Sequence, residues 1–389
     1  MHFGLAIDRF KINNNYLGKV KSIWTVRGFV PECHEDTQIL TLMKYTRKQI
    51  SRAGLTMLSS KSQKEVEDAV TIINDWRSNH VFVLDQLKPF VSSLFEDNGI
   101  EPLFSSQRLK RMTSIQYKLD LNPNMGLGGM QDIGGLRFVL QDVSTLEKTF
   151  GLIKQYLPEN FTIYKINDYV NERPKSSGYR SIHVVYQYSS RDERYDGLRV
   201  ELQIRTKLQH NWATAVETAG LASNTSLKSS QGDNNWLLFF KVVSCLMSIK
   251  EHKPMMPEYE KHTMEKLMRM CFKMDKKYKY TDTLKALRVT VHTVEEKQYI
   301  DDLYLIIINF EETMVTITGY STAERNDAIK QYAAEEETAI EGKKAVVLVA
   351  VDNIRNLKEA YPSYFLDTSE FITVLENIKR NCINRGWIE

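Results

Sequence analysis

The chain has 389 residues, of which 42% are hydrophobic, 10% aromatic and 26% charged. This composition is typical of soluble globular proteins and excludes disordered, collagen-like and low-complexity classes. The 52 basic and 49 acidic residues leave a net charge of +3, which is too small to indicate nucleic-acid or membrane binding by itself. At roughly 150 residues per domain, the length predicts two or three domains.

The cysteines and the apolar runs indicate a reduced, cytoplasmic protein. The four cysteines lie far apart and form no CxxC pair, so neither a local zinc site nor a disulfide framework is expected. No stretch reaches the ~18 apolar residues of a membrane span, and Lys241 interrupts the longest apolar run, 236–247. The first ten residues lack the basic and apolar regions of a secretory signal.

The N-terminal part of the chain is predicted to be helical up to about residue 100, because apolar residues recur there at three- and four-residue spacing. Between about 130 and 205, short β-branched or alternating runs indicate strands instead: IGGLRFVLQ, FTIYKIN, RSIHVVYQYS and LRVELQI. Helical spacing places a helix over 143–156, between the first two runs. The polar SRDERYDG segment between the last two predicts an antiparallel hairpin, and a helix follows from Thr206 to about Gly220.

The second half begins with a polar loop at 223–235 and continues as a helical stretch to about Tyr280. The methionines of this stretch favour core packing over partner binding. From about residue 285, LYLIIINF and MVTITGYS predict a hairpin, and AVVLVAV predicts a further strand. Ser321 and Glu324 fit a capping box at the start of a helix that lies between this hairpin and the AVVLVAV strand. A last helix is expected over 368–383.

These patterns predict an α+β fold, with a mixed β-sheet and flanking helices followed by a small C-terminal αβ domain. We divide the chain into an N-terminal helical region at 1–95, a sheet domain at 96–222, a helical connector at 223–282 and the αβ domain at 283–389. The αβ domain carries no motif of catalytic character. We therefore expect it to regulate rather than to catalyse.

Polar residues gather between 108 and 217, where the GxxxxGK[ST], HExxH and GxSxG signatures are all missing. The first polar cluster, RLKRMTSIQYK, places four positive charges within eleven residues, with Ser114 between them: Arg108, Lys110, Arg111 and Lys118. On a helix or at its entry, such a cluster either clamps a polyphosphate or is a solvated basic face.

Two further segments combine carboxylates with strand patterns. Asp132 stands at the mouth of a predicted strand, before Gly134 and Gly135, and either ligates Mg²⁺ or is a turn residue. In VELQIRT, alternation puts three polar side chains on one face: Glu201, Gln203 and Arg205. A row of charged and polar side chains on an otherwise apolar strand costs free energy unless water or a bound partner contacts it. The row therefore favours a functional face. His210 and Glu217, on the next helix, are expected to support it.

The segment ERPKSSGYRSIHVVY adds a loop with nucleotide-binding character. Lys175 and Arg180 flank Gly178–Tyr179, and a tyrosine beside a loop glycine can lie flat against a base. His183 follows on the next strand. A lone strand histidine is more often structural, but its place beside Tyr179 and Lys175 favours a functional role.

In this order, RLKRMTSIQYK, DIGGLRFVL, RPKSSGYRSIHVVY and VELQIRTKLQHNWATAVE resemble the synthetase domain of the RelA/SpoT family, the alarmone pyrophosphokinases. The resemblance implies a nucleotidyltransferase-like fold for 96–222, Mg²⁺ as cofactor, and ATP with GDP or GTP as substrates. The implied reaction transfers the β,γ-pyrophosphate of ATP to a ribose 3′-hydroxyl, giving (p)ppGpp and AMP.

The resemblance also implies a role for each matching position. The residues implied to bind ATP are Arg108, Lys110, Ser114, Lys118 and Arg137. Those implied to bind the acceptor are Lys175, Tyr179, His183, Gln203 and Arg205, with Tyr179 stacking on the guanine. Asp132 and Glu201 are implied to hold the metal and to form the catalytic pair, with Glu201 activating the acceptor hydroxyl.

Some features depart from the long family members. No His-Asp doublet occurs, so their metal-dependent hydrolase domain has no counterpart, and Ser177 precedes Gly178 where they usually carry Asn.

WRSNH and QGDNNWLLFFKVVSCL resemble a subgroup of small or fused members, several of which are toxins. The alternative is therefore transfer to the 3′ end of tRNA, which blocks translation, for example in phage defence. The C-terminal domain would then be a fused antitoxin or a sensor, or would meet a protein trigger. A non-catalytic nucleotide sensor is disfavoured, because both carboxylates are present.

Overall fold

The computed structural model describes residues 45–222, 234–289, 292–293, 303–309, 314–338, 344–350 and 368–387. These residues belong to one compact unit that spans Leu42–Glu389. The predictions for 1–44 and for the loops at 223–233 and 311–313 lie outside the described residues. No helix in the described ranges has the length and apolar character that a membrane span needs.

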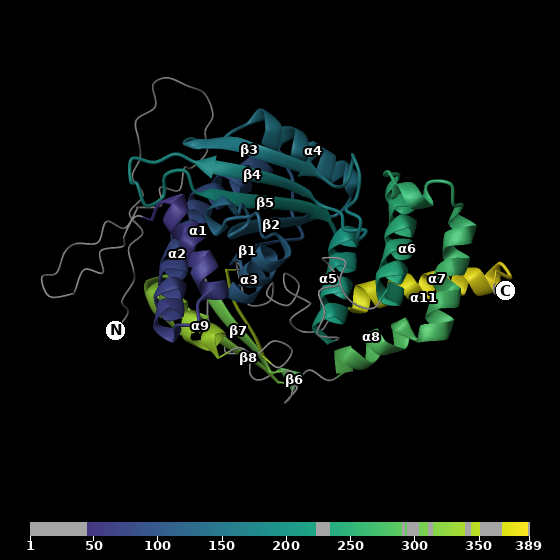
Figure 1. The fold of residues 1–389 in the computed structure, drawn as a ribbon. Coiled ribbons are helices and arrows are strands. Elements are labelled where there is room, and N and C mark those ends of the chain that lie inside the picture. The colour runs from purple at the N-terminus through teal and green to yellow at the C-terminus, as the bar shows by residue number, and fades with distance from the viewer. Residues whose placement is uncertain are drawn as a thin grey trace, which may run out of the picture. The chain divides into compact units, whose positions relative to one another are not determined.

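The described strands form one mixed sheet of nine strands, in the order β3-β4-β5-β2-β1-β9-β7-β8-β6 (Figure 1). Their bounds are β1 Phe104–Leu109, β2 Gly134–Leu140, β3 Phe161–Asp168, β4 Ile182–Tyr188, β5 Arg199–Thr206, β6 His292–Thr293, β7 Leu303–Asn309, β8 Met314–Tyr320 and β9 Lys344–Ala350. β2 runs parallel to β5, and β4 and β5 form the predicted antiparallel hairpin. The α+β prediction is confirmed.

One face of the sheet is apolar and is covered by α2 (Gln63–Asp97) and α4 (Val143–Gln155), with α1 (Arg47–Ser59) packed on α2. The apolar side chains of α2 recur at helical spacing and are buried: Ile73, Leu84, Leu87 and Val91. A Cβ at Gly134 would lie 3.1 Å from His80 Cβ and from Leu84 Cδ1. Glycine at this position therefore lets α2 approach β2 closely.

Five helices pack together around a second hydrophobic core, which we call the helical cluster (Figure 1). They are α5 Lys207–Ala222, α6 Asn234–Glu251, α7 Met264–Tyr278, α8 Tyr280–Val289 and α11 Ser369–Asn384, with the short helix η3 Pro257–Tyr259 between α6 and α7. Met256 and Met268 are buried in it, which confirms core packing for these two methionines. α11 comes from the C-terminal end of the chain and packs on α5, α7 and α8.

The remaining elements form the C-terminal αβ segment, which consists of β7, β8, η4 (Thr322–Glu324), α9 (Arg325–Glu337) and β9. β7 and β8 form the predicted antiparallel hairpin. Glu324 Oε2 accepts the backbone N–H of Ser321 at 3.0 Å, which is the bond that the glutamate of a capping box makes, and the short helix η4 begins directly after Ser321. β9 also pairs with β1, where Gln107 faces Ala350 and Arg108 faces Val349. The sheet is therefore continuous from the N-terminal to the C-terminal part, and the domain boundaries stay a prediction.

The basic cluster RLKRMTSIQYK differs from the prediction in one respect. Its first residues belong to strand β1, which the sequence patterns did not indicate, and α3 (Met112–Leu121) begins only afterwards. Arg108 therefore lies on a strand and not on a helix. Four of the six residues of β1 are polar, and the strand forms because β2 and β9 both pair with it. The short helix η1 (Leu127–Gly129) follows α3.

Candidate functional site

The sheet register brings five of the predicted residues to one face. Gly135 on β2 pairs with Arg108 on β1 and with Glu201 on β5, and Gln203 pairs with both Arg137 and His183. Directly paired residues point to the same side of a sheet. The face therefore carries Arg108, Arg137, His183, Glu201 and Gln203, opposite the apolar face that α2 covers. The shared face predicted for VELQIRT is confirmed.

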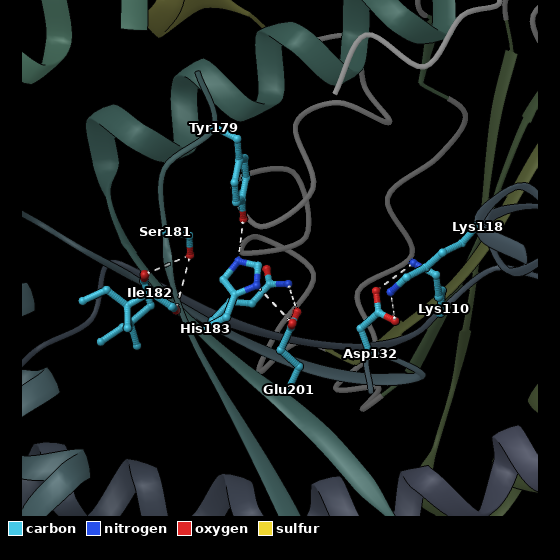
Figure 2. Close-up of polar contacts among 10 residues, drawn as sticks. Lys110, Lys118, Asp132, Tyr179, Ser181, Ile182, His183 and Glu201 are labelled. Atoms are coloured by element: carbon cyan, nitrogen blue, oxygen red, sulfur yellow. Dashed lines mark hydrogen bonds and ion pairs between the residues drawn. The ribbon is translucent and has the colours of Figure 1, made fainter. Parts of the chain in front are cut away.

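Glu201 lies at the centre of a chain of hydrogen bonds. Its Oε2 lies 3.0 Å from His183 Nδ1, and Gln203 Nε2 donates to its Oε1 at 2.6 Å (Figure 2). The residue is only 8% exposed. Burial alone would raise the pKa of Glu201, but the charge and hydrogen bond of His183 outweigh burial and hold this pKa below its ordinary value. Glu201 is therefore ionised at neutral pH.

His183 links Glu201 to Tyr179, whose hydroxyl lies 3.0 Å from His183 Nε2 (Figure 2). Burial alone would lower the pKa of His183, but Glu201 and Tyr179 raise it to about 9. At neutral pH the ring therefore carries a positive charge, and both ring nitrogens donate, one to Glu201 and one to Tyr179. This double contact fixes the orientation of the ring.

Asp132 forms the other charged group of the site, directly before β2. Lys110 Nζ lies 3.0 Å from its Oδ2, and Lys118 Nζ lies 2.9 Å from its Oδ1 (Figure 2). Burial would raise the pKa of Asp132, but the two lysines lower it well below its ordinary range. The charge of Asp132 in turn raises the pKa of Glu201, so the two carboxylates interact electrostatically. Ser114, predicted between the lysines, lies on α3 and is partly exposed.

Arginines extend the positive charge along the same face. Arg205 is buried on β5, and burial followed by repulsion from Arg137 lowers its pKa to about 9. Its guanidinium donates to Nδ1 of His210 on α5, so the supporting role predicted for His210 is a contact to Arg205. Arg108 also repels Arg205. A group of arginines on one face favours binding of a polyanion.

The surroundings of Tyr179 in the 175–181 loop differ most from what the sequence predicts. Tyr179 is 5% exposed, because its ring belongs to the core of the helical cluster. Lys175 Nζ lies 5.2 Å from the centre of the Tyr179 ring and 4.8 Å from that of Tyr169. Stacking of Tyr179 on a base therefore stays a prediction, and it requires the ring to become more accessible than it is in this structure.

Tyr169 is a residue of this site that the sequence reasoning missed. It follows β3, is partly buried, and its ring lies 5.5 Å from that of His183 in an edge-on arrangement. Burial and the charge of Glu201 raise the pKa of the Tyr169 hydroxyl. The signal in the sequence is weak, since it consists only of an aromatic residue directly after a predicted strand.

Ser181 ties the same loop to the sheet. Its hydroxyl donates to the backbone carbonyl of Ile204 at 3.0 Å (Figure 2). Ser244 on α6 donates to the carbonyl of Gly178 at 2.6 Å from the other side. The loop is therefore held by β5 and by the helical cluster together.

The carboxylates of the site are few. Within the described ranges no group of three or more His, Cys, Asp or Glu residues is placed to hold a metal ion. Asp132 and Glu201 supply hard oxygen donors, which suit Mg²⁺. A metal ion held there would need further oxygen ligands from outside the chain.

Comparison with known proteins decides the family of the segment that carries this site. Residues 107–230 match the family described as the region found in RelA/SpoT proteins. This segment is a RelA/SpoT domain. The resemblance predicted from the four motifs is therefore confirmed. The match ends before α6, so most of the helical cluster and the C-terminal αβ segment lie beyond it.

Two curated relatives of the RelA/SpoT domain come from Bacillus subtilis strain 168. The GTP pyrophosphokinase YwaC is 27% identical over 167 residues, which are 39% of this chain and 78% of that protein. The GTP pyrophosphokinase YjbM is 35% identical over 127 residues, which are 31% of this chain and 57% of that protein. Both alignments thus cover well under half of the present chain.

Two solved structures match a similar share of the chain. Small alarmone synthetase 2 from Bacillus subtilis has 24% identity and a TM-score of 0.38, covering 45% of this chain and 93% of that one. Small alarmone synthetase 1 from the same organism, bound to its product pppGpp, has 26% identity and a TM-score of 0.37, covering 46% of this chain and 90% of that one.

Proposed function

We propose that this protein is a pyrophosphokinase that transfers the β,γ-pyrophosphate of ATP to the ribose 3′-hydroxyl of GDP or GTP. Its RelA/SpoT domain is related to two GTP pyrophosphokinases. The observation that carries the proposal is a pair of carboxylates on neighbouring strands. The partly buried Asp132 lies between two lysines directly before β2, and the buried Glu201 on β5 is held by His183. The lysines around Asp132 suit the binding of phosphates, and Glu201 suits an acceptor hydroxyl.

The donor side requires positive charge around the transferring phosphates, because the transition state carries charge on their oxygens. Lys110 and Lys118 converge on Asp132, and Arg108 and Arg137 lie on the adjacent strands. The Lys110 side chain is only 19% exposed, and burial lowers its pKa. Electrostatic attraction of phosphate is strong in such a place.

Mg²⁺ fits this donor set. Proteins usually hold Mg²⁺ with one or two carboxylates together with substrate phosphates and water, and Asp132 and Glu201 would supply the two carboxylates. When bound, the ion would neutralise phosphate charge and orient the phosphates. The lack of a three-residue metal cluster among the described residues is consistent with ligands that arrive with ATP.

The acceptor side requires a group that orients the hydroxyl and accepts its proton. Glu201 is ionised, its Oε1 also accepts from Gln203, and His183 fixes its other oxygen. Transfer of a phosphoryl group proceeds through a loose transition state, so the carboxylate mainly aligns the hydroxyl and receives the proton late. Lys175 and Tyr169 lie beside this group and would contact the acceptor.

The test follows label from the γ-phosphate of ATP, with Mg²⁺ and with GDP, GTP, ATP or deacylated tRNA as acceptor. We expect label in a guanosine nucleotide together with release of AMP. Glu201→Gln should lower the rate by about 100-fold or more, as loss of a general base does, whereas Glu159→Gln, an exposed glutamate in the loop before β3, should not. An unchanged rate for Glu201→Gln would contradict the site, and label on tRNA alone would instead support the predicted tRNA-modifying alternative.

A further inference from the structure

A carboxylate from the C-terminal αβ segment reaches the beginning of α3. Tyr332 and Glu336 lie four residues apart on α9, and both are buried. Oε1 of Glu336 accepts the backbone N–H of Met112 at 2.5 Å and the hydroxyl of Tyr332 at 2.9 Å. The contact to Met112 spans 224 residues of sequence.

Arg77 on α2 completes this contact. It is 2% exposed, and its Nη1 lies 3.1 Å from Oε2 of Glu336. Its Nη2 donates to the carbonyl of Lys110 at 2.7 Å and to the Tyr332 hydroxyl at 2.9 Å. One buried ion pair thus holds both ends of residues 110–112, which we call the 110–112 connection.

The 110–112 connection joins β1 to α3, and α3 has no cap of its own. Its N-cap residue, Arg111, makes no side-chain capping hydrogen bond. Glu336 takes this place, since it accepts the first N–H of the helix and brings negative charge to its positive end. A buried ion pair of this kind adds little net stability compared with apolar packing, so its use is to fix a position.

The position that it fixes is that of the two lysines of the site. Lys110 belongs to the connection itself, and Lys118 lies in the last turn of α3. Both ammonium groups are bound to Asp132. A shift or rotation of α3 would move the Lys118 ammonium relative to Lys110.

We propose that Glu336 is a positioning residue for the phosphates of ATP, and that it acts through Arg77 and the 110–112 connection. This inference rests on the proposed function and adds to it a dependence of ATP binding on the C-terminal αβ segment. Displacement of α9, by a protein partner for example, would leave α3 uncapped and Arg77 unpaired. The segment therefore supports the donor site, and its removal lowers the affinity for ATP.

The test compares Glu336→Ala and Glu336→Gln with Glu335→Gln in the full chain. Glu335 is the neighbour of Glu336 on α9, is partly exposed and pairs with Lys344 at 2.7 Å, away from α3. We expect Glu336→Ala to raise the KM for ATP by about 10-fold, or about 1.4 kcal/mol, with the KM for the acceptor unchanged. Glu336→Gln keeps an acceptor for Met112 and should lie between Glu336→Ala and the wild type, and Glu335→Gln should match the wild type.

Hydrogen exchange without nucleotide gives an independent measurement. The amides of 112–118 should exchange faster in Glu336→Ala than in Glu335→Gln, because α3 loses its cap. Equal exchange and equal KM for ATP in these two variants would overturn the inference. If the wild type neither turns over nor binds a non-hydrolysable ATP analogue, the proposed function and the role of Glu336 in ATP binding both fail. Faster exchange would then still show that Glu336 holds α3.

Discussion

Asp132 is partly buried and Glu201 is buried, and the cations that hold these two carboxylates differ in how freely they can move. Lys110 and Lys118 each reach Asp132 through a long, flexible side chain. An ammonium group can donate to new partners without a fixed geometry. His183 is held at both ring nitrogens and cannot turn away from Glu201 without breaking two contacts. At the residue scale, the donor half of the site is therefore adaptable and the acceptor half is rigid.

His183 gives a prediction for stability as a function of pH. Its pKa is raised from an ordinary 6.5 to about 9 in the folded chain, because Glu201 and Tyr179 outweigh burial. The protonated ring therefore stabilises the fold fully below the unfolded pKa, and this contribution is lost as pH rises through about 9. We expect the difference in free energy of unfolding between wild type and His183→Gln to shrink over this window, by at most about 3 kcal/mol.

Urea unfolding at several pH values between about 6 and 9.5 measures this difference. His252→Asn is the matched control, because His252 is exposed and its φ of 53° suits asparagine. Its difference from wild type should stay constant over the same window. A constant difference for His183→Gln as well would show that His183 is not charged by Glu201.

At the element scale, the features that sequence could predict are those with a local pattern. Alternation in VELQIRT placed Glu201 and Gln203 on one face correctly, since side chains alternate along any strand. The neighbours of a strand are set by distant segments, and so the pairing of β1 with β9 was not predictable. The strand β1 itself was missed because it owes its form to that pairing. For the same reason no pattern indicated that Glu336 caps α3.

The 175–181 loop contains a glycine whose backbone conformation disfavours other residues, and this leads to a prediction for stability. Gly178 has a φ of +91°, and a Cβ there would lie 3.0 Å from Ser244 Cβ and 3.2 Å from Trp212 Cζ2. We expect Gly178→Ala to lower the free energy of unfolding by about 1 kcal/mol or more, because alanine is strained at this φ. If the proposed function holds, the KM for the acceptor should rise as well.

Gly151 on α4 is the control for this substitution. A Cβ there would meet nothing within 4 Å, so Gly151→Ala should stabilise the protein by about 0.4–1 kcal/mol through the unfolded chain. Urea denaturation of both variants measures the contrast. A Gly178→Ala protein as stable as Gly151→Ala would contradict the description of this loop.

At the scale of the whole molecule, the C-terminal part of the chain supports the site from two directions. α9 contacts the 110–112 connection through Glu336, and α11 closes the helical cluster that holds the 175–181 loop. The first contact lies beside the lysines proposed to bind the donor, and the second lies beside the loop that carries Lys175 and Tyr179. The C-terminal part is thus bound into the fold of the RelA/SpoT domain and not merely attached to it.

The second of these contacts gives a prediction for α11. Phe371 is buried there, and its ring lies 5.8 Å from that of Phe240, which in turn packs against Trp212 beside Gly178. We expect Phe371→Ala to destabilise the protein by about 3–5 kcal/mol, as other buried phenylalanine truncations do. Ile383→Ala on the same helix should cost less than about 0.5 kcal/mol, because Ile383 is 53% exposed.

Calorimetric melting temperatures of the two variants measure this contrast, and Phe371→Leu keeps enough volume for kinetic assays. With Phe371→Leu, the KM for the acceptor should rise more than the KM for ATP, because α11 reaches the site through the 175–181 loop. Glu336→Ala should show the reverse preference. Equal melting temperatures for Phe371→Ala and Ile383→Ala would mean that α11 does not pack on the helical cluster in solution. An equal rise of both KM values would mean that the C-terminal part acts on the domain as one block, without separate donor and acceptor contacts.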